Sequence, residues 1–195
     1  MPHDAHHIPT ADAEPPHERR FHGGPDRLRA PDRVARLEVP RVVALCLDGI
    51  NATAVLDVGT GTGIFAEAFA AQNLAVTGID VNTDLLAVAR QTVPLAQFEP
   101  APMEKIPFAD RSFDLVFLGH VLHEADDPLA ALTEAHRLAR QRVAILEWPY
   151  LSEEKGPPLE HRVKPDMVRE WAAQAGFYHA EIMQLEHMAF YRLTP

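Results

Sequence analysis

Residues 54–68 read AVLDVGTGTGIFAEA, and this stretch decides the fold class. Its first part is an apolar run of the kind that forms a strand buried on both faces of a parallel sheet. The run ends at Gly59, Gly61 and Gly63, and a helical pattern follows at once. Glycine lets a ligand approach the backbone closely near the N-terminus of a helix. The stretch therefore predicts a strand, a ligand-binding turn and a helix.

Two residues around this turn indicate which ligand it takes. Asp57 puts a carboxylate beside the glycines, where it would repel a pyrophosphate and suit a ligand that carries an amine. A dinucleotide-binding turn, G-x-G-x-x-G, would need glycine where Ile64 stands. A nicotinamide-dependent oxidoreductase is therefore an alternative that both residues disfavour.

Apolar runs and helical patterns alternate along the rest of the chain. We expect further strands at 75–79, 96–98, 113–119, 142–147, 179–183 and 187–193, the last two close enough to form a hairpin. We expect helices at 39–47, 64–72, 84–92, 128–139 and 165–176, and a short one opening near Pro31. Asn82 or Thr83 suits the N-cap of the helix at 84–92. This alternation predicts an α/β fold with a doubly wound parallel sheet covered by helices on both faces.

The composition divides the chain into three parts. Residues 1–18, rich in proline and histidine, are expected to be a disordered tail. Residues 19–52 are expected to form an N-terminal arm with helices, and residues 53–195 are expected to form the doubly wound α/β domain. Neither the length nor the patterning predicts an oligomeric state.

The charge and the cysteine content limit which classes of binding partner and which kinds of site we expect. The 18 Lys and Arg against 28 Asp and Glu give a net charge of −10, which opposes contact with nucleic acid and favours a small-molecule partner. The single cysteine, Cys46, excludes a disulfide framework and a cysteine metal cluster. No apolar run has the length of a membrane helix, and no signal-peptide core is present, so we expect a cytoplasmic protein without a membrane partner.

The motif DVGTGTG at residues 57–63 resembles the first motif of class I S-adenosylmethionine-dependent methyltransferases, and residues 75–80 resemble that family's second strand with its terminal acidic residue. The resemblance covers residues 19–195. It implies a seven-stranded sheet with an antiparallel last strand, S-adenosyl-L-methionine as cofactor, and methyl transfer to a small-molecule acceptor by in-line displacement. It also implies that the arm is a lid over the cofactor cleft, with packing on the back of the sheet as the alternative. A non-catalytic cofactor-binding module is a further alternative.

The resemblance carries cofactor-binding roles over to particular positions. Asp80 would accept hydrogen bonds from ribose hydroxyls, or cap a helix, or both. Asp57 would lie at the methionine end of the cofactor or hold the glycine turn. The family often has an aspartate for the adenine amine where this chain has Pro102, so recognition would rest on Met103 or on Glu104, which is otherwise solvated. The full cofactor set is Asp57, Gly59, Thr60, Gly61, Gly63, Asp80, Val81, Met103, Glu104 and Gly119.

Histidines are the candidate catalytic residues. His120 directly follows a predicted strand and is either a general base or substrate-orienting group, or a loop hydrogen-bonding residue. His123 is a second catalytic candidate, or a capping residue, and His22 would face the substrate if the arm is a lid. Residues 147–150 are expected to form an acidic and aromatic rim. A metal cluster of these three histidines with Glu147 is an alternative.

Overall fold

The apolar runs of the sequence form one seven-stranded sheet in the computed structural model, which describes residues 23–195. Its strand order is β3-β2-β1-β4-β5-β7-β6. Strands β1 to β5 run parallel, and β7 is antiparallel to both of its neighbours. The strands are β1 (Ala54–Val58), β2 (Ala75–Asp80), β3 (Gln97–Pro100), β4 (Phe113–Gly119), β5 (Ala139–Glu147), β6 (His179–Gln184) and β7 (Ala189–Thr194). The predicted fold class and antiparallel last strand are confirmed.

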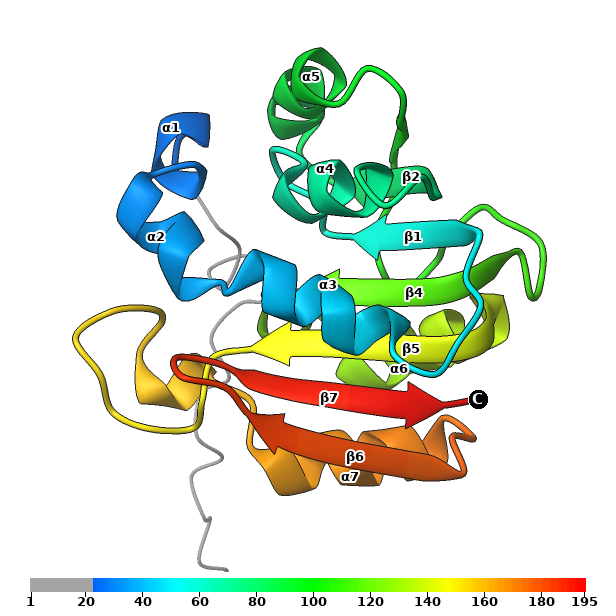
Figure 1. The fold of residues 1–195 in the computed structure, drawn as a ribbon. Helices are drawn as coiled ribbons and strands as arrows, with labels where there is room; N and C mark the ends of the chain where they lie inside the picture. The colour runs from blue at the N-terminus through cyan, green and yellow to red at the C-terminus, as the bar shows by residue number, and fades with distance from the viewer. Residues whose placement is uncertain (1–22) are drawn as a thin grey trace, which may run out of the picture.

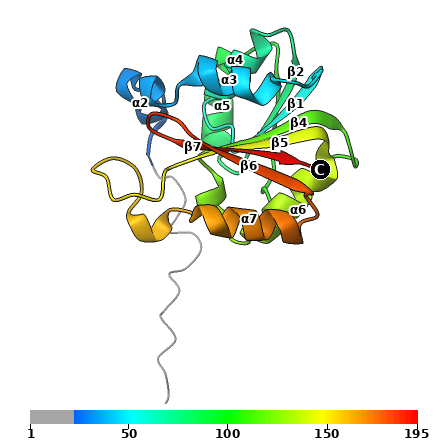
Figure 2. The ribbon, with the colours of Figure 1, turned by 60° about the horizontal axis from the view of Figure 1, so that its bottom comes forward.

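Helices cover both faces of this sheet, with α3 and α4 on one side and α6 and α7 on the other (Figure 2). The α-helices are α1 (Pro25–Leu28), α2 (Pro31–Arg36), α3 (Val39–Leu47), α4 (Ile64–Ala70), α5 (Thr83–Thr92), α6 (Pro128–Leu138) and α7 (Pro165–Gln174). Two 3-10 turns, η2 (Leu122–Glu124) and η3 (Leu159–His161), complete the set. Helix α1 was not predicted, because its four residues are too few to show a helical period. Residues 1–18 and His22 lie outside the described residues.

The strands divide the core into two layers, because successive side chains of a strand point to opposite faces. Val55 on β1 packs with the cluster that includes α3, α4 and α5. Its neighbour Leu56 packs with the cluster that includes α6 and α7. The continuous apolar runs at β1 and β4 thus reflect burial on both faces, as expected for central parallel strands.

Most of the strands differ from the sequence prediction at one or both ends, by one to three residues. β2 and β6 each end one residue later than expected, and β7 begins at Ala189 rather than at residue 187. β5 begins at Ala139 rather than at residue 142, because the polar Arg140 and Gln141 separate Ala139 from the apolar run. The start of β5 still pairs with β4, across a register shift between Phe113 and Leu115. β3 spans Gln97–Pro100 instead of 96–98, because three of its four residues are exposed. Strand ends at the sheet border therefore carry little hydrophobic signal.

The carboxyl ends of the parallel strands meet at one edge of the sheet. Figure 1 shows β1, β4 and β5 pointing toward the side where α1 and α2 lie, with the loop after β5 on the same side. The chain winds outward from β1 to β3 and then returns to place β4 beside β1 on the other flank. This reversal is the switch point at which ligands bind in open parallel sheets.

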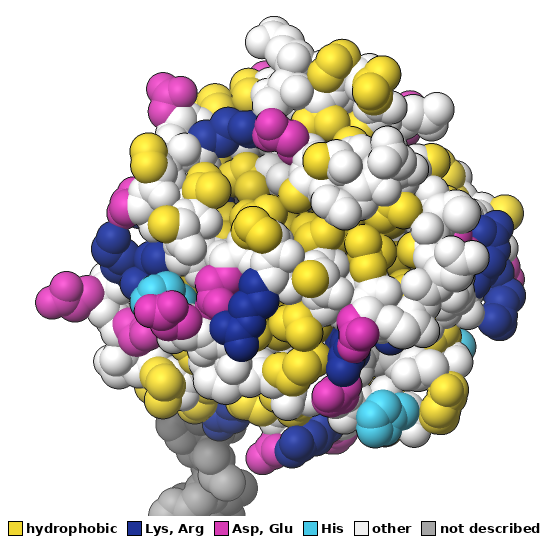
Figure 3. All heavy atoms as spheres, in the orientation of Figure 1, with side chains coloured by type: hydrophobic (Ala, Val, Ile, Leu, Met, Phe, Trp, Pro, Cys, Tyr) yellow, Lys and Arg dark blue, Asp and Glu magenta, His cyan; other side chains and the backbone are white. Residues whose placement is uncertain are grey.

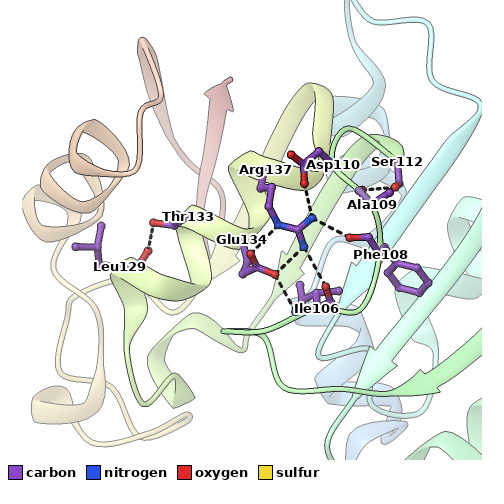
Figure 4. Close-up of polar contacts among 9 residues, drawn as sticks. All are labelled: Ile106, Phe108, Ala109, Asp110, Ser112, Leu129, Thr133, Glu134 and Arg137. Carbon is purple, nitrogen blue, oxygen red and sulfur yellow. Dashed lines mark hydrogen bonds and ion pairs between the residues drawn. The ribbon is translucent and has the colours of Figure 1, made fainter.

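Arg137 on α6 fixes the segment between β3 and β4 (Figure 4). Its guanidinium donates to the backbone carbonyls of Phe108 and Ile106 at 2.8 and 3.0 Å. It also pairs with Asp110 at 2.8 Å and with Glu134 at 2.7 Å. Glu134 in turn accepts the Ile106 amide at 2.8 Å. The network holds the chain just past the predicted adenine-side residues.

Charges of both signs are interspersed on the surface that Figure 3 shows. On this face the basic side chains lie in several small groups, most of them beside acidic ones. Within residues 23–195, no helix is both long and apolar enough to cross a membrane.

Candidate functional site

A cavity of about 1120 Å³ lies at the carboxyl edge of the sheet. Its wall comes from the ends of β1, β2 and β4, from α1 and α2, and from residues 154–157 after β5. Binding pockets of roughly 300 to 1,000 Å³ hold one drug-sized ligand, so this cavity has room for a cofactor and a small second ligand. The predicted residues in its wall are Gly59, Thr60, Gly61, Asp80, Val81, Met103, Glu104, Gly119, His120 and His123.

Asp80 closes the glycine turn from the neighbouring strand. Its two carboxylate oxygens accept the amides of Gly61 and Asn82, both at 2.8 Å. The Asn82 side chain, rather than Asp80, caps α5 by accepting from the amides of Asp84 and Leu85. A carboxylate has about four acceptor positions, so Asp80 retains capacity for ligand hydroxyls. Burial raises its pKa, although hydrogen bonds from the backbone amides act in the opposite direction.

The turn itself requires glycine at the position after β1. Gly59 has φ of +66°, and a Cβ there would lie 2.4 Å from Cγ2 of Val121. Gly61, with φ of +54°, also lies in the left-handed region. The backbone therefore forms an open cradle that any larger residue would both strain and fill.

Asp57 lies beneath this turn instead of in the cavity wall. It is 2% exposed and accepts the Thr60 hydroxyl at 2.6 Å. Burial raises its pKa to about 7, against the lowering effect of hydrogen bonds from Thr60 and from the Ala66 backbone in the first turn of α4. Gly63 is also absent from the wall, and its amide donates to the Thr60 carbonyl at 2.9 Å. In this geometry Asp57 supports the glycine turn from below, and it does not line the cavity.

The predicted adenine side is apolar at its surface. Val81 is 49% exposed although it borders the cavity, so a flat ligand here would cover apolar surface. Met103 contributes to the same wall. Glu104 is not merely solvated, since its Oε1 accepts the Asp126 amide at 2.9 Å and its position is thereby fixed.

His120 occupies a strained position at the end of β4. Its φ of +57° is rare outside glycine, and its amide donates to the Leu146 carbonyl at 2.8 Å. The ring lies 4.9 Å from the Trp148 ring, and Nε2 lies 3.1 Å from Sδ of Met188. Nδ1 is buried without a hydrogen-bond partner in the described part of the chain. Burial lowers the pKa of His120 to about 3, so the ring is a neutral hydrogen-bonding group and a weak base.

His123, in the middle of η2, and Glu147, the last residue of β5, form a buried pair. Nδ1 of His123 lies 2.9 Å from Oε2 of Glu147, and the His123 amide donates to Oε1 at 3.1 Å. Glu147 is fully buried, so the predicted acidic rim is wrong: the carboxylate points inward to the histidine. Burial alone would lower the pKa of His123, but the charge and hydrogen bond of Glu147 raise it above its ordinary value.

Arg162 was not predicted from the sequence, and it organises the loop after β5. Its guanidinium donates to the carbonyls of Pro149, Lys155 and Pro157 at 3.0, 2.7 and 2.9 Å. It also lies 5.5 Å from the centre of the Trp148 ring, which it holds in the cavity wall. Because its partners are mainly backbone carbonyls, no sequence motif could have revealed this role.

The described part of the arm also reaches the cavity. Leu28, Arg33 and Arg36 of α1 and α2 line it. Asp32 on α2 pairs at 2.7 Å with Lys155 in the loop after β5. Within residues 23–195, no group of three or more metal-ligating side chains comes together, and His22 lies outside that range.

Residues 56–146 match a family of methyltransferase domains. A demethylmenaquinone methyltransferase of Chlorobaculum parvum is 36% identical over 95 residues, which are 48% of this chain and 39% of the relative. The chain therefore spans less than half the length of that curated relative. Neither the oxidoreductase nor the non-catalytic alternative is favoured by these matches.

Solved structures share the fold. A methyltransferase of Aquifex aeolicus has a TM-score of 0.76 at 24% identity and covers 88% of this chain and 98% of its own. A magnesium protoporphyrin IX methyltransferase of Synechocystis with bound S-adenosylhomocysteine has a TM-score of 0.67 at 16% identity, covering 83% of each chain. The matched region runs from β1 to β5, the strands whose carboxyl ends build the cavity, and this part of the chain resembles the class I S-adenosylmethionine-dependent methyltransferases in its sequence and its fold.

Proposed function

We propose that the protein transfers a methyl group from S-adenosyl-L-methionine to a small-molecule acceptor. The observation that carries this proposal is the cavity in which Asp80 closes an open glycine turn at one end while His120 and His123 line the other. The cavity exceeds the usual volume of a single-ligand pocket, which suits two reactants held side by side.

The residues present fit the cofactor. The Asp80 carboxylate would accept the ribose hydroxyls, and Val81 and Met103 would cover the adenine with apolar surface. The cradle at Gly59 would take the methionine end, close to the backbone. When bound, the sulfonium would supply an electrophilic methyl group, so the protein's part is to align the acceptor and exclude water.

We further propose that α1 and α2 act as a lid, together with the loop after β5. The ion pair between Asp32 and Lys155 joins α2 to the loop after β5, and both residues line the cavity. Deleting residues 1–33 should then lower turnover more than cofactor affinity, because the acceptor would lose alignment. Unchanged turnover in the shortened protein would contradict the lid. His22 stays a candidate for the substrate-facing side of that arm.

Calorimetry and a product assay test the proposed function. We expect binding of S-adenosylmethionine, no binding of NAD, and release of S-adenosylhomocysteine with at least one compound of a small-molecule panel. Because the relative named above is a demethylmenaquinone methyltransferase, the panel should include quinol rings. Failure to bind S-adenosylmethionine at about 1 mM, the upper end of ordinary KM values, would refute the proposal.

A further inference from the structure

We propose that His123 is the general base of the reaction, that Glu147 is its positioning residue, and that the acceptor carries an ionisable hydroxyl group such as a phenol or enol. This inference rests on the proposed methyl transfer. It starts from the ring geometry of His123, which the preceding function does not require.

Glu147 fixes the orientation and tautomer of the His123 ring. The carboxylate is fully buried and receives the His123 amide, its Nδ1 at 2.9 Å, and the Trp148 amide at 3.2 Å. With the proton of the neutral ring on Nδ1, the lone pair lies on Nε2. Nε2 lies 3.9 Å from Oε1 of Glu124, which is beyond hydrogen-bond distance. A base held by a buried carboxylate at its other nitrogen is the arrangement that general-base catalysis uses.

His123 borders two cavities. It contributes to the main cavity and also to a second one of about 310 Å³ beside η3 and α7. The main cavity would let an acceptor reach the His123 ring. The second cavity would let solvent take up the proton that the ring has accepted. His120, the other candidate, is less suited, because its Nε2 contacts Met188 and burial keeps its pKa near 3. Its unpartnered Nδ1 suits a hydrogen bond to the acceptor instead.

The charges around the acceptor end favour a hydroxyl over an amine. Arg33 and Arg36 both line the cavity, and both act electrostatically on His120. Guanidinium groups would repel an ammonium ion and stabilise an oxyanion. The acidic side chains Asp80 and Glu104 lie at the cofactor end, where each accepts a backbone amide. Glu124 also lines the cavity and offsets part of the charge of Arg33, so that Arg36 supplies the further positive charge beside His120.

The proton and electron pairs balance in one displacement. The hydroxyl proton passes to Nε2 of His123 and then to solvent. The acceptor oxygen forms the new bond to the methyl carbon as the carbon–sulfur bond breaks, and that bond's electron pair stays on sulfur. Glu147 keeps its charge throughout and stabilises the imidazolium.

Nuclear magnetic resonance of the histidine rings tests the pair without any acceptor. We expect the pKa of His123 to lie above 6.5, its ordinary value, because Glu147 outweighs burial. Glu147→Gln should lower that pKa by about 1 to 3 units, and Glu147→Asp should keep most of the elevation. The other charged or titratable groups around the ring are Glu124, His120, Arg162, Glu160, His161 and Lys164. A pKa below 6.5, or one unchanged in Glu147→Gln, would overturn the assignment.

Asp114→Asn is the matched control for a lost buried carboxylate. Asp114 accepts the Thr53 and Ala54 amides at the opposite end of the sheet, so its loss should affect stability but leave the His123 titration unchanged. An equal shift in Asp114→Asn would show that the effect is general and would overturn the positioning role.

Rates with ring-substituted phenols of graded acidity test the base. His123→Gln should lower kcat/KM by roughly 10²- to 10⁴-fold for the least acidic phenol and by under about tenfold for phenols already ionised at the assay pH. His120→Gln should lower kcat/KM by a similar factor for every phenol of the series. A uniform loss in His123→Gln, or turnover of benzylamines but of no phenol, would overturn the proposal. If the wild type fails to bind S-adenosylmethionine in calorimetry, the proposed function fails, and the ring titration still decides the pair.

Discussion

Gly59→Ala should be strongly destabilising, and its cost can be worked out from two separate contributions. The residue has φ of +66°, and an L-residue in the left-handed region costs about 1 to 2 kcal/mol. The new Cβ would also lie 2.4 Å from Cγ2 of Val121, and such overpacking costs about 1 to 3 kcal/mol. Together these give a loss of about 2 to 5 kcal/mol in the free energy of unfolding, which is a large fraction of a typical domain's stability of about 5 to 15 kcal/mol.

Gly49→Ala separates the two contributions. Gly49 has φ of +74°, but nothing lies within 4 Å of its Cβ position, so it should cost only about 1 to 2 kcal/mol. Urea denaturation followed by circular dichroism measures each variant at one temperature. Combining Gly59→Ala with Val121→Ala should recover most of the overpacking cost, seen as a favourable coupling energy in a double-mutant cycle.

Three outcomes of this series would contradict the packing argument. Gly59→Ala could prove no more destabilising than Gly49→Ala, which would mean that the turn accommodates a methyl group. The coupling with Val121→Ala could be zero, which would mean that the two side chains do not meet. Gly59→Ala could also bind S-adenosylmethionine as tightly as the wild type, although the proposed cradle at this glycine takes the methionine end.

Three further predictions concern the site and its supports. Asp80→Ala should weaken S-adenosylmethionine binding by about 1 to 3 kcal/mol, because it removes the charged acceptor, and equal affinity in calorimetry would leave Asp80 a loop support only. Burial raises the pKa of Asp57 to about 7, so this group favours folding while protonated and loses that contribution as pH rises from 3.8 through 7. The free energy of unfolding, measured by urea denaturation at a series of pH values, should therefore fall less between pH 3.8 and 7 in Asp57→Asn than in the wild type. The same pH dependence in both proteins would argue against a buried, protonated Asp57. Arg162→Gln leaves the carbonyls of the loop after β5 unpaired, so limited proteolysis should cut residues 149–158 faster, whereas an unchanged cleavage rate would show that other contacts hold the loop.

Much of the fold followed from local pattern. The alternation of apolar runs and helical periods predicted the strands that form the sheet centre, and β4 begins and ends at the predicted residues. Prediction failed where the local pattern was short or polar. α1 has four residues, and β5 begins before its apolar run, with the polar residues Arg140 and Gln141.

Only part of the candidate site could be predicted from the sequence. The glycine turn and Asp80 lie next to strand ends, so position along the chain was enough to find them. His123 and Glu147 were grouped from the sequence only as possible ligands of one metal ion. The hydrogen bond between them could not be predicted, because the two residues follow different strands and meet through the pairing of β4 with β5. The same holds for Arg162, whose partners are carbonyls of a loop.

The sequence by itself determined the α/β class, the ligand-binding turn and the edge of the sheet where a ligand lies, because strand and helix periods and glycine requirements are local properties of the chain. Only the tertiary structure decided what each ionisable group does. Burial, hydrogen-bond partners and nearby charges depend on residues distant in sequence, and they fix Asp57 beneath the turn, keep His120 neutral, and pair His123 with Glu147.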